Sequence, residues 1–463
     1  MSRAWLLFMG ILIARGVVVA WTDPSNISNT SKASNYPAIT VDDQERVHVT
    51  WAEDYFEVSK IFYACLDGDI WSTPIDVSRN DIHTCFYRSS VEVDNRGRVH
   101  VVWNYNSFDL MWTYCDGDTW SIPANVSNTP RLSAGPRTTA DDSGRIHLVW
   151  HDESSGKPEI YYSMYDGESW QGPQRITNSP GEEHCFWPDI TRDSNGYLHV
   201  VWTHYGGGGS DDYWIQYSKY DGSSWSSPLD ILKLGGEHIT NSRIGMDSQD
   251  HPHLVAERWL GRAIYYTHYD GNGTAWATPY LVYEGSHARR PDIAIDICSG
   301  TGCVVWGDRY YRFFQDTTWD SVSCIAGPDG VAPALVVGRG TFHLVWAATG
   351  DIYYSGHRLT GIESQEEPTP KGFNLDQNFP NPFIGKTVIS YQIPEDSWVT
   401  LIISNPLGMV IEKAHLGYRL AGDYNVPILS SSFEKEGGAY VGIYFYTIKA
   451  GNFAQTRKMV VVH

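Results

Sequence analysis

One short pattern recurs seven times along this chain, and its spacing limits what the chain can fold into. In the clearest copy, residues 135–177, turns rich in Asp, Gly and Ser separate four short segments of alternating apolar and polar residues. Such alternation between turn residues predicts β-strands. The second segment has a core that reads His-x-x-Trp in five copies, with Ala in place of Trp at 253–256 and Cys in place of His at 303–306. The cores are residues 48–51, 100–103, 147–150, 199–202, 253–256, 303–306 and 343–346.

The length of the repeat predicts the architecture. Four short strands in about 45 residues is the period of a β-propeller blade. Seven copies therefore predict an all-β chain with a seven-bladed β-propeller over residues 21–361. The seventh copy lacks its last strand, and residues 21–28 resemble the missing Trp-x-x-Pro segment. We expect this N-terminal strand to complete the seventh blade, because closing the ring removes exposed sheet edges.

The segments outside the repeats have compositions of their own. Residues 1–20 contain Arg3 and an apolar run, which predicts a secretory signal peptide. Residues 362–371 are charged and Pro-rich, and we interpret them as a linker. Residues 372–463 alternate apolar and polar side chains in short strands, which predicts a small Ig-like β-sandwich.

Several short motifs occur in order within this last segment: residues 378–383 (Asn-Phe-Pro-Asn-Pro-Phe), 407–408, 421–422, 442–446 (Gly-Ile-Tyr-Phe-Tyr) and 456–459. The set resembles the type A C-terminal sorting domain of type IX secretion cargo. The usual Asn-Pro-Phe-Asn-Pro reads Asn-Pro-Phe-Ile-Gly at 381–385, and the stretch 429–438 is longer than usual. The resemblance implies a Bacteroidetes-like bacterium, export through the periplasm to the cell surface, and the type IX secretion machinery as a partner. An adhesive or sugar-binding Ig-like module is the alternative.

Composition narrows the possible partners. The net charge is −20, which argues against nucleic acid and anionic membranes. After residue 20 no apolar run approaches the length of a transmembrane segment. The seven cysteines are Cys65, Cys85, Cys115, Cys185, Cys298, Cys303 and Cys324. Cys298 and Cys303 bracket a turn and are candidates for a disulfide, while the other pairings stay open. No Cys or His spacing predicts a metal site.

Asp-Gly turns recur between the third and fourth strands, each followed by a Trp, at Asp67, Asp116, Asp166 and Asp221. They resemble the Asp-box (BNR-like) turn of sialidase-type propellers, Ser-x-Asp-x-Gly-x-x-Trp, although Asp and Gly are adjacent here. The resemblance covers residues 21–360 and implies the fold, with these turns on the face opposite the site. The turns 94–97 and 193–196 could bind calcium, but a hairpin turn is the favoured explanation for them. We therefore expect no cofactor.

The repeat separates scaffold from site. A residue found in nearly every copy serves the blade, so the six repeated histidines and the repeated tryptophans are interpreted as structural. Residues that break the pattern gather in the loops between second and third strands and between blades, which project from one face. Aromatic, Arg and carboxylate groups together suit a saccharide. The candidate ligand-binding residues are Tyr87, Arg88, Trp187, Tyr205, Arg243, Glu257, Arg258, Arg290, Asp308 and Arg309.

Three functions remain open. The favoured hypothesis is a secreted, cell-surface β-propeller that binds glycan or another extracellular polymer. The first alternative is a carbohydrate-active enzyme. If it is sialidase-like, the resemblance implies Glu257, Tyr311 and Asp54 as catalytic residues, but the Arg-Ile-Pro signature is absent. A polysaccharide lyase needs a base near an Arg-neutralised uronate, for which His184, His238 or Tyr205 would serve. The second alternative is a structural or protein-binding propeller.

Overall fold

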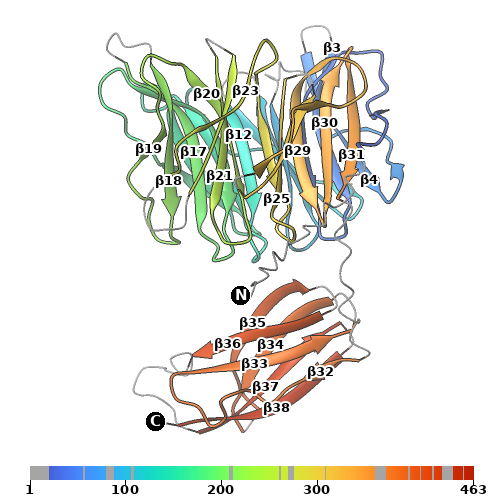
Figure 1. Cartoon of the computed structure of the whole chain (residues 1–463), viewed down its shortest axis with the longest axis vertical. Coiled ribbons are helices and arrows are strands. Elements are labelled where there is room, and N and C mark those ends of the chain that lie inside the picture. Colours follow the sequence, from blue (N-terminus) through green and yellow to red (C-terminus); the bar gives the residue numbers. More distant parts are fainter. Residues whose placement is uncertain are drawn as a thin grey trace, which may run out of the picture. The chain divides into compact units, whose positions relative to one another are not determined.

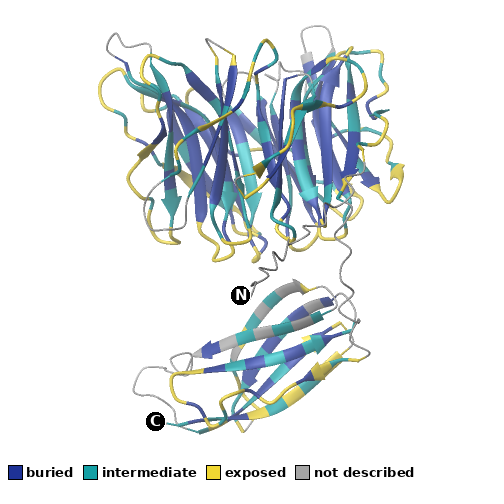
Figure 2. Cartoon of the chain, viewed as in Figure 1, coloured by how far each residue is buried: buried dark blue, intermediate teal, exposed yellow. Residues whose placement is uncertain are grey.

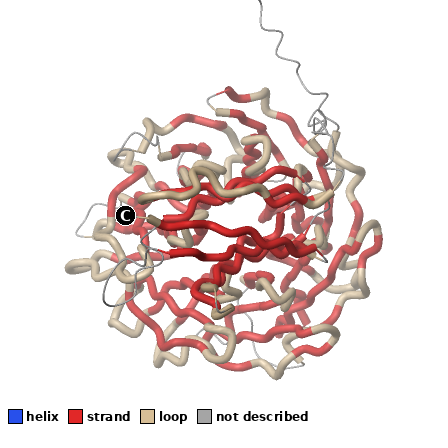
Figure 3. The backbone as a smooth tube through the Cα atoms, turned by 90° about the horizontal axis from the view of Figure 1, so that it is seen from below, coloured by secondary structure: helices blue, strands red, loops and turns tan. Residues whose placement is uncertain are grey.

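The chain consists of strands and loops in two compact units, Met1–Thr360 and Gly361–His463. A computed structural model describes residues 20–55, 58–79, 88–105, 109–207, 212–259, 262–269, 276–307, 309–316, 318–359, 372–394, 397–406, 408–419, 422–429, 442–451 and 453–462. Within these ranges every regular element is a strand (Figures 1 and 3). None of them contains a helix of the length and apolar character that a membrane span requires.

Six sheets of the first unit follow the chain in order, each built from consecutive antiparallel strands. The first two are β2 (Ser34–Val41), β3 (Val47–Tyr55), β4 (Val58–Asp67), β5 (Ile70–Trp71) with β6 (Ile75–Asp76), and β7 (Ser89–Val93), β8 (Val99–Tyr105), β9 (Asp109–Asp116), β10 (Thr119–Trp120) with β11 (Ala124–Asn125). The next two are β12 (Ser133–Ala140), β13 (Ile146–Asp152), β14 (Glu159–Tyr165), β15 (Trp170–Arg175), and β16 (His184–Arg192), β17 (Leu198–Tyr205), β18 (Tyr213–Tyr220), β19 (Leu229–Leu232). The last two are β20 (Ile239–Met246), β21 (Pro252–Arg258), β22 (Ala263–His268), β23 (Tyr280–Glu284), and β24 (Asp292–Ile295), β25 (Thr301–Trp306), β26 (Tyr310–Gln315), β27 (Thr318–Trp319) with β28 (Ser323–Cys324).

A seventh sheet joins the two ends of this unit. It contains β29 (Gly330–Gly338), β30 (Thr341–Ala348), β31 (Asp351–Arg358) and, at its edge, β1 (Ser25–Asn26). Ser25 lies opposite Tyr354, and Ile27 N–H donates to the Ile352 carbonyl at 2.9 Å. The first strands β2, β7, β12, β16, β20, β24 and β29 contact one another in that order, and β29 contacts β2 again. The sheets therefore follow one another around a circle in a propeller-like arrangement (Figure 3).

The second strands form the core of this unit because they are buried on both faces, as the burial colours show (Figure 2). All seven residues of β13 are buried. The Trp of the repeat is fully buried in six sheets, as Trp51, Trp103, Trp150, Trp202, Trp306 and Trp346. A large aromatic side chain at the same place in each sheet fills the space between neighbouring sheets.

The repeated histidines are structural, as predicted from their recurrence. His147 is buried; its Nδ1 lies 2.8 Å from the Tyr162 hydroxyl and its Nε2 lies 3.3 Å from the Asp141 carboxylate. His48, His199 and His253 make the same two contacts with a Tyr of the third strand and an Asp of the preceding turn. His100 makes the Asp contact and accepts from Trp112 Nε1–H, and His343 makes the Tyr contact.

The turns on the same side as these histidines are built by aspartate. Asp94 Oδ1 accepts from the N–H groups of Arg96 and Arg98, both at 2.9 Å. In the Asp-Gly turns, Asp166 Oδ1 accepts from the N–H groups of Glu168 and Ser169 at 2.9 and 2.8 Å. Backbone donors thus occupy these carboxylates, as in a hairpin turn. Within the described part of the chain, no group of three His, Cys, Asp or Glu side chains is placed to hold a metal ion.

The Cys298–Cys303 disulfide considered from the sequence is wrong, because both thiols are free. Cys303 lies within the β24–β25 ladder opposite Ala294 and is buried, whereas Cys298 is exposed in the turn beyond the ladder. The two residues therefore do not face each other across the hairpin. Cys85 lies outside the described residues.

The second unit contains two antiparallel sheets. One has the order β32 (Asn374–Leu375), β33 (Lys386–Ile393), β36 (Gly422–Leu429), and the other has the order β35 (Val410–Arg419), β34 (Ser397–Ser404), β37 (Gly442–Ala450), β38 (Phe453–Val461). A single apolar cluster draws side chains from both sheets, among them Ile389, Ile403, Tyr446 and Met459. Asn378 and Phe383 of the Asn-Phe-Pro-Asn-Pro-Phe motif are buried, whereas Phe379 is exposed.

Candidate functional site

The first strands of five of the seven sheets contain a bulge. The register shifts between Asn35 and Ala38 in β2, and at the equivalent places in β12, β16, β20 and β29. One residue at each bulge has a positive φ, namely Tyr36 (51°), Gly135 (67°), Trp187 (48°), Asn241 (49°) and Ala332 (55°), and Arg290 (47°) has it just before β24. Bulges re-aim side chains, and positive φ in residues with large side chains must be held by their surroundings.

An acceptor from the preceding sheet holds two of these positive-φ residues. The N–H of Arg290 donates to the Glu257 carboxylate, and the N–H of Gly135 donates to Asn104 Oδ1 at 3.3 Å. Glu257 and Asn104 occupy the same place in the repeat, directly after the second-strand core. Burial raises the pKa of Glu257, and hydrogen bonds from Arg290 and Asn241 oppose that rise. Glu257 is therefore a positioning residue for Arg290.

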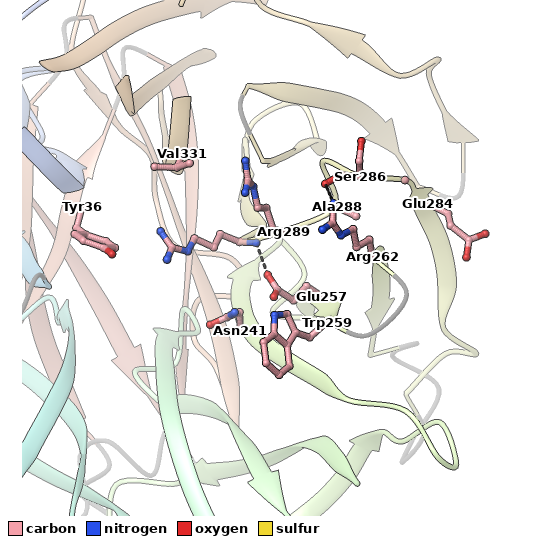
Figure 4. Close-up of a pocket in the computed structure, with 12 residues that line it drawn as sticks. Tyr36, Asn241, Glu257, Trp259, Arg262, Glu284, Ser286, Ala288, Arg289 and Val331 are labelled. Atoms are coloured by element: carbon pink, nitrogen blue, oxygen red, sulfur yellow. Dashed lines mark hydrogen bonds between the residues drawn. The ribbon is translucent and has the colours of Figure 1, made fainter. Parts of the chain in front are cut away.

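A cavity of about 1090 Å³ opens beside this contact (Figure 4). Its lining comes from the bulges, from the β21–β22 connection and from the loop after β23. The lining residues are Tyr36, Asn241, Glu257, Trp259, Arg262, Glu284, Gly285, Ser286, Ala288, Arg289, Arg290 and Val331. We call it the outer cavity.

The outer cavity combines an exposed aromatic ring with an excess of arginine. Trp259 is 65% exposed, and Figure 4 shows its indole next to Glu257 on the cavity wall. Three lining residues are arginines and two are glutamates, and one of these, Glu284, is paired with Arg258 at 2.6 Å. An exposed indole offers a face for a sugar ring, and guanidinium groups bind carboxylate or sulfate.

A second cavity of about 50 Å³, the inner cavity, shares Tyr36, Asn241 and Arg290 with the outer one. Its other lining residues are Pro37, Arg88, Ser89, Arg137, Arg243, Pro291, Asp292, Ala332, Pro333 and Ala334. Four of its residues are thus arginines. Burial and the neighbouring Arg243, Arg137 and Arg290 lower the pKa of Arg88 to about 9.

The structure brings together part of the set predicted from the sequence. Arg88, Arg243 and Arg290 line the inner cavity, and Glu257 and Arg290 line the outer one. Trp187, Tyr205, Arg258 and Arg309 are absent from the described lining of both cavities. Tyr87 and Asp308 lie outside the described residues. Their roles in binding stay predictions.

Each of the four predicted residues outside the lining has its own contacts. Arg309 pairs with Asp329 at 2.5 Å, and Arg258 pairs with Glu284. Trp187 packs against Phe186, and Tyr205 lies between His184 and Tyr213.

The sialidase-like trio implied by the resemblance is not assembled. Tyr311 packs against Trp21 and Phe313 in the core between two sheets, and burial raises its pKa. Asp54 accepts from Ser59 Oγ–H at 2.8 Å at the end of the β3–β4 hairpin. Only Glu257 reaches the outer cavity, because inter-sheet packing directs Tyr311 elsewhere. The lyase bases considered from the sequence, His184, His238 and Tyr205, also lie outside the described lining.

Sequence reasoning missed several lining residues, among them Tyr36, Arg137, Arg262 and Asp292. For three of them a signal was present. Tyr36, Arg137 and Asp292 adjoin a Pro that recurs at the same place in the repeat, in residues 36–38, 135–137, 187–189, 290–292 and 332–334. The residues flanking this Pro vary from copy to copy in size and charge, which marks them as lining residues. Arg262 has no comparable signal.

Comparisons with known proteins support the fold. No protein-family model and no curated protein sequence matches this chain. A fungal alcohol oxidase of the AA5 family, in complex with copper, matches at TM-score 0.51 and 11% identity over 96% of this chain and 99% of its own. An ulvan lyase of family PL25, bound to a saccharide of glucuronate and sulfated rhamnose, matches at TM-score 0.51 and 11% identity over 73% of this chain and 95% of its own. These likenesses confirm the predicted all-β, propeller-like fold and show nothing finer.

Proposed function

We propose that this protein recognises an acidic polysaccharide through its outer cavity. The observation that carries the proposal is the presence of Arg262, Arg289 and Arg290 around one cavity together with the exposed Trp259. The chain as a whole has a charge of −20, so attraction of an anion must come from a local group of arginines. Carboxylate or sulfate groups fit the guanidinium donors, and a sugar ring fits the indole face.

The size of the outer cavity favours a ligand of several sugar units. Its volume of about 1090 Å³ is at the upper end of the range for small-molecule sites. It is bounded on one side by Tyr36 and on the other by Glu284, so a chain of sugars has contacts along its length (Figure 4). The ulvan lyase of similar fold has a saccharide containing glucuronate bound to it, which agrees with this ligand class.

Binding of acidic and neutral glycans to the full chain tests the proposal. We expect binding to uronate-containing or sulfated oligosaccharides and little binding to neutral ones of equal length. Arg262→Ala should weaken binding about 10-fold or more, because a charge-assisted hydrogen bond contributes about 1.5–3 kcal/mol. Trp259→Ala should weaken it about 3- to 10-fold. Arg175→Ala is the matched control, since Arg175 lies on the outer strand β15 and contacts Asn178. Equal binding of neutral and acidic glycans would contradict the proposal.

Eliminative cleavage of the same ligand is a second candidate function. Tyr36 lines both cavities, and its ring centre lies 5.2 Å from the guanidinium carbon of Arg290. A tyrosine beside an arginine that neutralises a uronate is an arrangement suited to removing a proton next to the carboxylate. An assay for unsaturated uronate products distinguishes the two functions. Turnover that is lost in Tyr36→Phe while binding remains would make this protein a lyase.

The remaining architecture and the route of export are also proposals. We infer that the seven sheets are the blades of one seven-bladed propeller over residues 21–361, closed by the pairing of β1 with β31. The two-sheet unit after the linker at 362–371 is interpreted as an Ig-like sorting domain, residues 372–463, that directs the chain to the cell surface through the type IX machinery. Residues 1–20 would direct it to the periplasm first. Cell fractionation with and without residues 372–463 tests this route.

A further inference from the structure

The inner cavity has properties that the outer cavity lacks. At about 50 Å³ it has room for an ion or a water molecule but none for a sugar ring. Arg88, Arg137, Arg243 and Arg290 line it, and Asp292 is the one carboxylate in its described lining. The concentration of positive charge in so small a space calls for a counter-ion.

The nearby carboxylates neutralise this charge only in part. Asp292 Oδ2 accepts from the N–H of Leu335 at 2.8 Å, and its Oδ1 lies 3.9 Å from Arg243 Nε. Asp189 Oδ2 accepts from the N–H of Ile244 at 3.0 Å, and its Oδ1 lies 3.5 Å from Arg137 Nε. Each aspartate thus holds the first strand of the next sheet with one oxygen. The other oxygen lies beyond the usual length of a charge-assisted hydrogen bond to arginine.

The positive charges of Arg88 and Arg290 are balanced by nearby carboxylates even less. Within the described ranges, no carboxylate forms an ion pair with the side chain of Arg88 or Arg290, although the guanidinium of Arg290 lies over the ring of Tyr36. Burial and mutual repulsion lower the pKa of Arg137 to about 10, as they lower that of Arg88. Both pKa values lie well above neutral pH, so Arg88 and Arg137 carry positive charge beside Arg243 and Arg290 across the inner cavity.

We propose that the inner cavity binds one small monovalent inorganic anion, with chloride as the physiological example. The anion lies between Arg88, Arg137, Arg243 and Arg290 and accepts hydrogen bonds from their N–H groups. It stabilises the first unit by relieving the repulsion among its central first strands. The anion site needs no saccharide, although it shares Tyr36, Asn241 and Arg290 with the outer cavity.

Thermal unfolding of the full chain in two sodium salts of equal ionic strength tests the proposal. One salt is chloride and the other is isethionate, a monovalent anion too bulky for the inner cavity. We expect the Tm to be higher in chloride by about 2–4 °C and the difference to saturate with concentration, as ligand binding to the folded state requires. Equal Tm values in the two salts would overturn the proposal.

A substitution and a crystal separate the site from general salt effects. Arg243→Ala should abolish the chloride response, and the repeat already has an alanine at the equivalent places, Ala38 and Ala334. Arg175→Ala should keep the response. Crystals grown in bromide should show an anomalous peak among the four arginines whether or not the variant folds. Absence of that peak, or its displacement by a soaked uronate that enters the inner cavity, would overturn the assignment to an inorganic anion.

Discussion

The two ends of the second strands in the first unit are built on opposite principles. At the amino-terminal ends, His48, His147, His199 and His253 repeat the same contacts with an aspartate and a tyrosine. At the carboxyl-terminal ends the equivalent residues differ from sheet to sheet, as Asn104, His151 and Glu257 do. Residues that recur from sheet to sheet support the fold, and we call them the frame. Residues that differ at an equivalent place in the repeat indicate the candidate site.

Glu257 shows that the division is not absolute. Its identity differs from that of its counterparts, yet it accepts from the N–H of a positive-φ residue in the next sheet just as Asn104 does. A residue that breaks the pattern can therefore still carry a structural contact, and that contact places Arg290 between the two cavities. The hydrogen bond from the Arg290 N–H to Glu257 therefore belongs both to the frame and to the candidate site.

Removal of residues 21–28 should have the largest effect on the stability of the frame, because these residues pair with the last sheet. The deletion removes β1, the buried Ile27, and Ser28, whose Oγ donates to Asp351 and accepts from the N–H of Ile352. We expect a loss of about 4 kcal/mol in the free energy of unfolding, measured by urea denaturation. Ile122→Ser, at a position that is 77% exposed, should stay within about 0.5 kcal/mol of the wild type. If the deletion cost no more than this control, ring closure would not stabilise the unit.

Acid should weaken the frame by a smaller amount for each histidine that it protonates. Burial lowers the pKa of His199 and His343 to about 4, and burial and Arg88 lower that of His151 to about 4. Below the ordinary value of 6.5 the unfolded chain binds protons that the folded chain does not, so stability falls as the pH decreases from 6.5 toward 4. Each histidine contributes on the order of 2 kcal/mol.

The aspartates of the frame extend this effect to lower pH. Hydrogen bonds from His48 and Arg46 outweigh burial and lower the pKa of Asp42 to about 2, so its contribution is lost as the pH falls from 3.8 toward 2. Unfolding midpoints in urea between pH 8 and pH 3 measure both steps. A midpoint that stayed constant from pH 7 to pH 4 would show that the histidines are not held neutral.

The smallest expected effect is a difference in the free energy of unfolding between variants of two repeated histidines. His147 contacts both Tyr162 and Asp141, whereas His343 contacts Tyr354 and its Nε2 has no partner among the described residues. His147→Ala should therefore cost about 1 kcal/mol more than His343→Ala, the usual contribution of one buried hydrogen bond. Matched urea titrations of the two variants measure this difference. Equal costs would mean that the tyrosine contact alone supports the strand.

Much of the fold was predictable because the same sequence pattern occurs seven times along the chain. The strand cores around Trp103, Trp150 and Trp202 lie in β8, β13 and β17, and the four-strand period reappears in the sheets. The resemblance of residues 21–28 to other last strands predicted a pairing that is present between Ser25 and Tyr354. The site was less predictable. Arg88, Arg243 and Arg290 were singled out, but Tyr36 and Arg137 were missed because they stand inside strands that looked regular.

The amino-acid sequence by itself determined the all-β class, the repeating unit and the structural role of the histidines. These follow from local alternation and from recurrence, which need no knowledge of distant contacts. Only the tertiary structure decided which pattern-breaking residues share a cavity, because Tyr36 and Arg290 have a positive φ and an acceptor from the preceding sheet, Glu257, holds Arg290 in place. The tertiary structure also decided that Tyr311 belongs to the core, because Trp21, which is distant in sequence, packs against it.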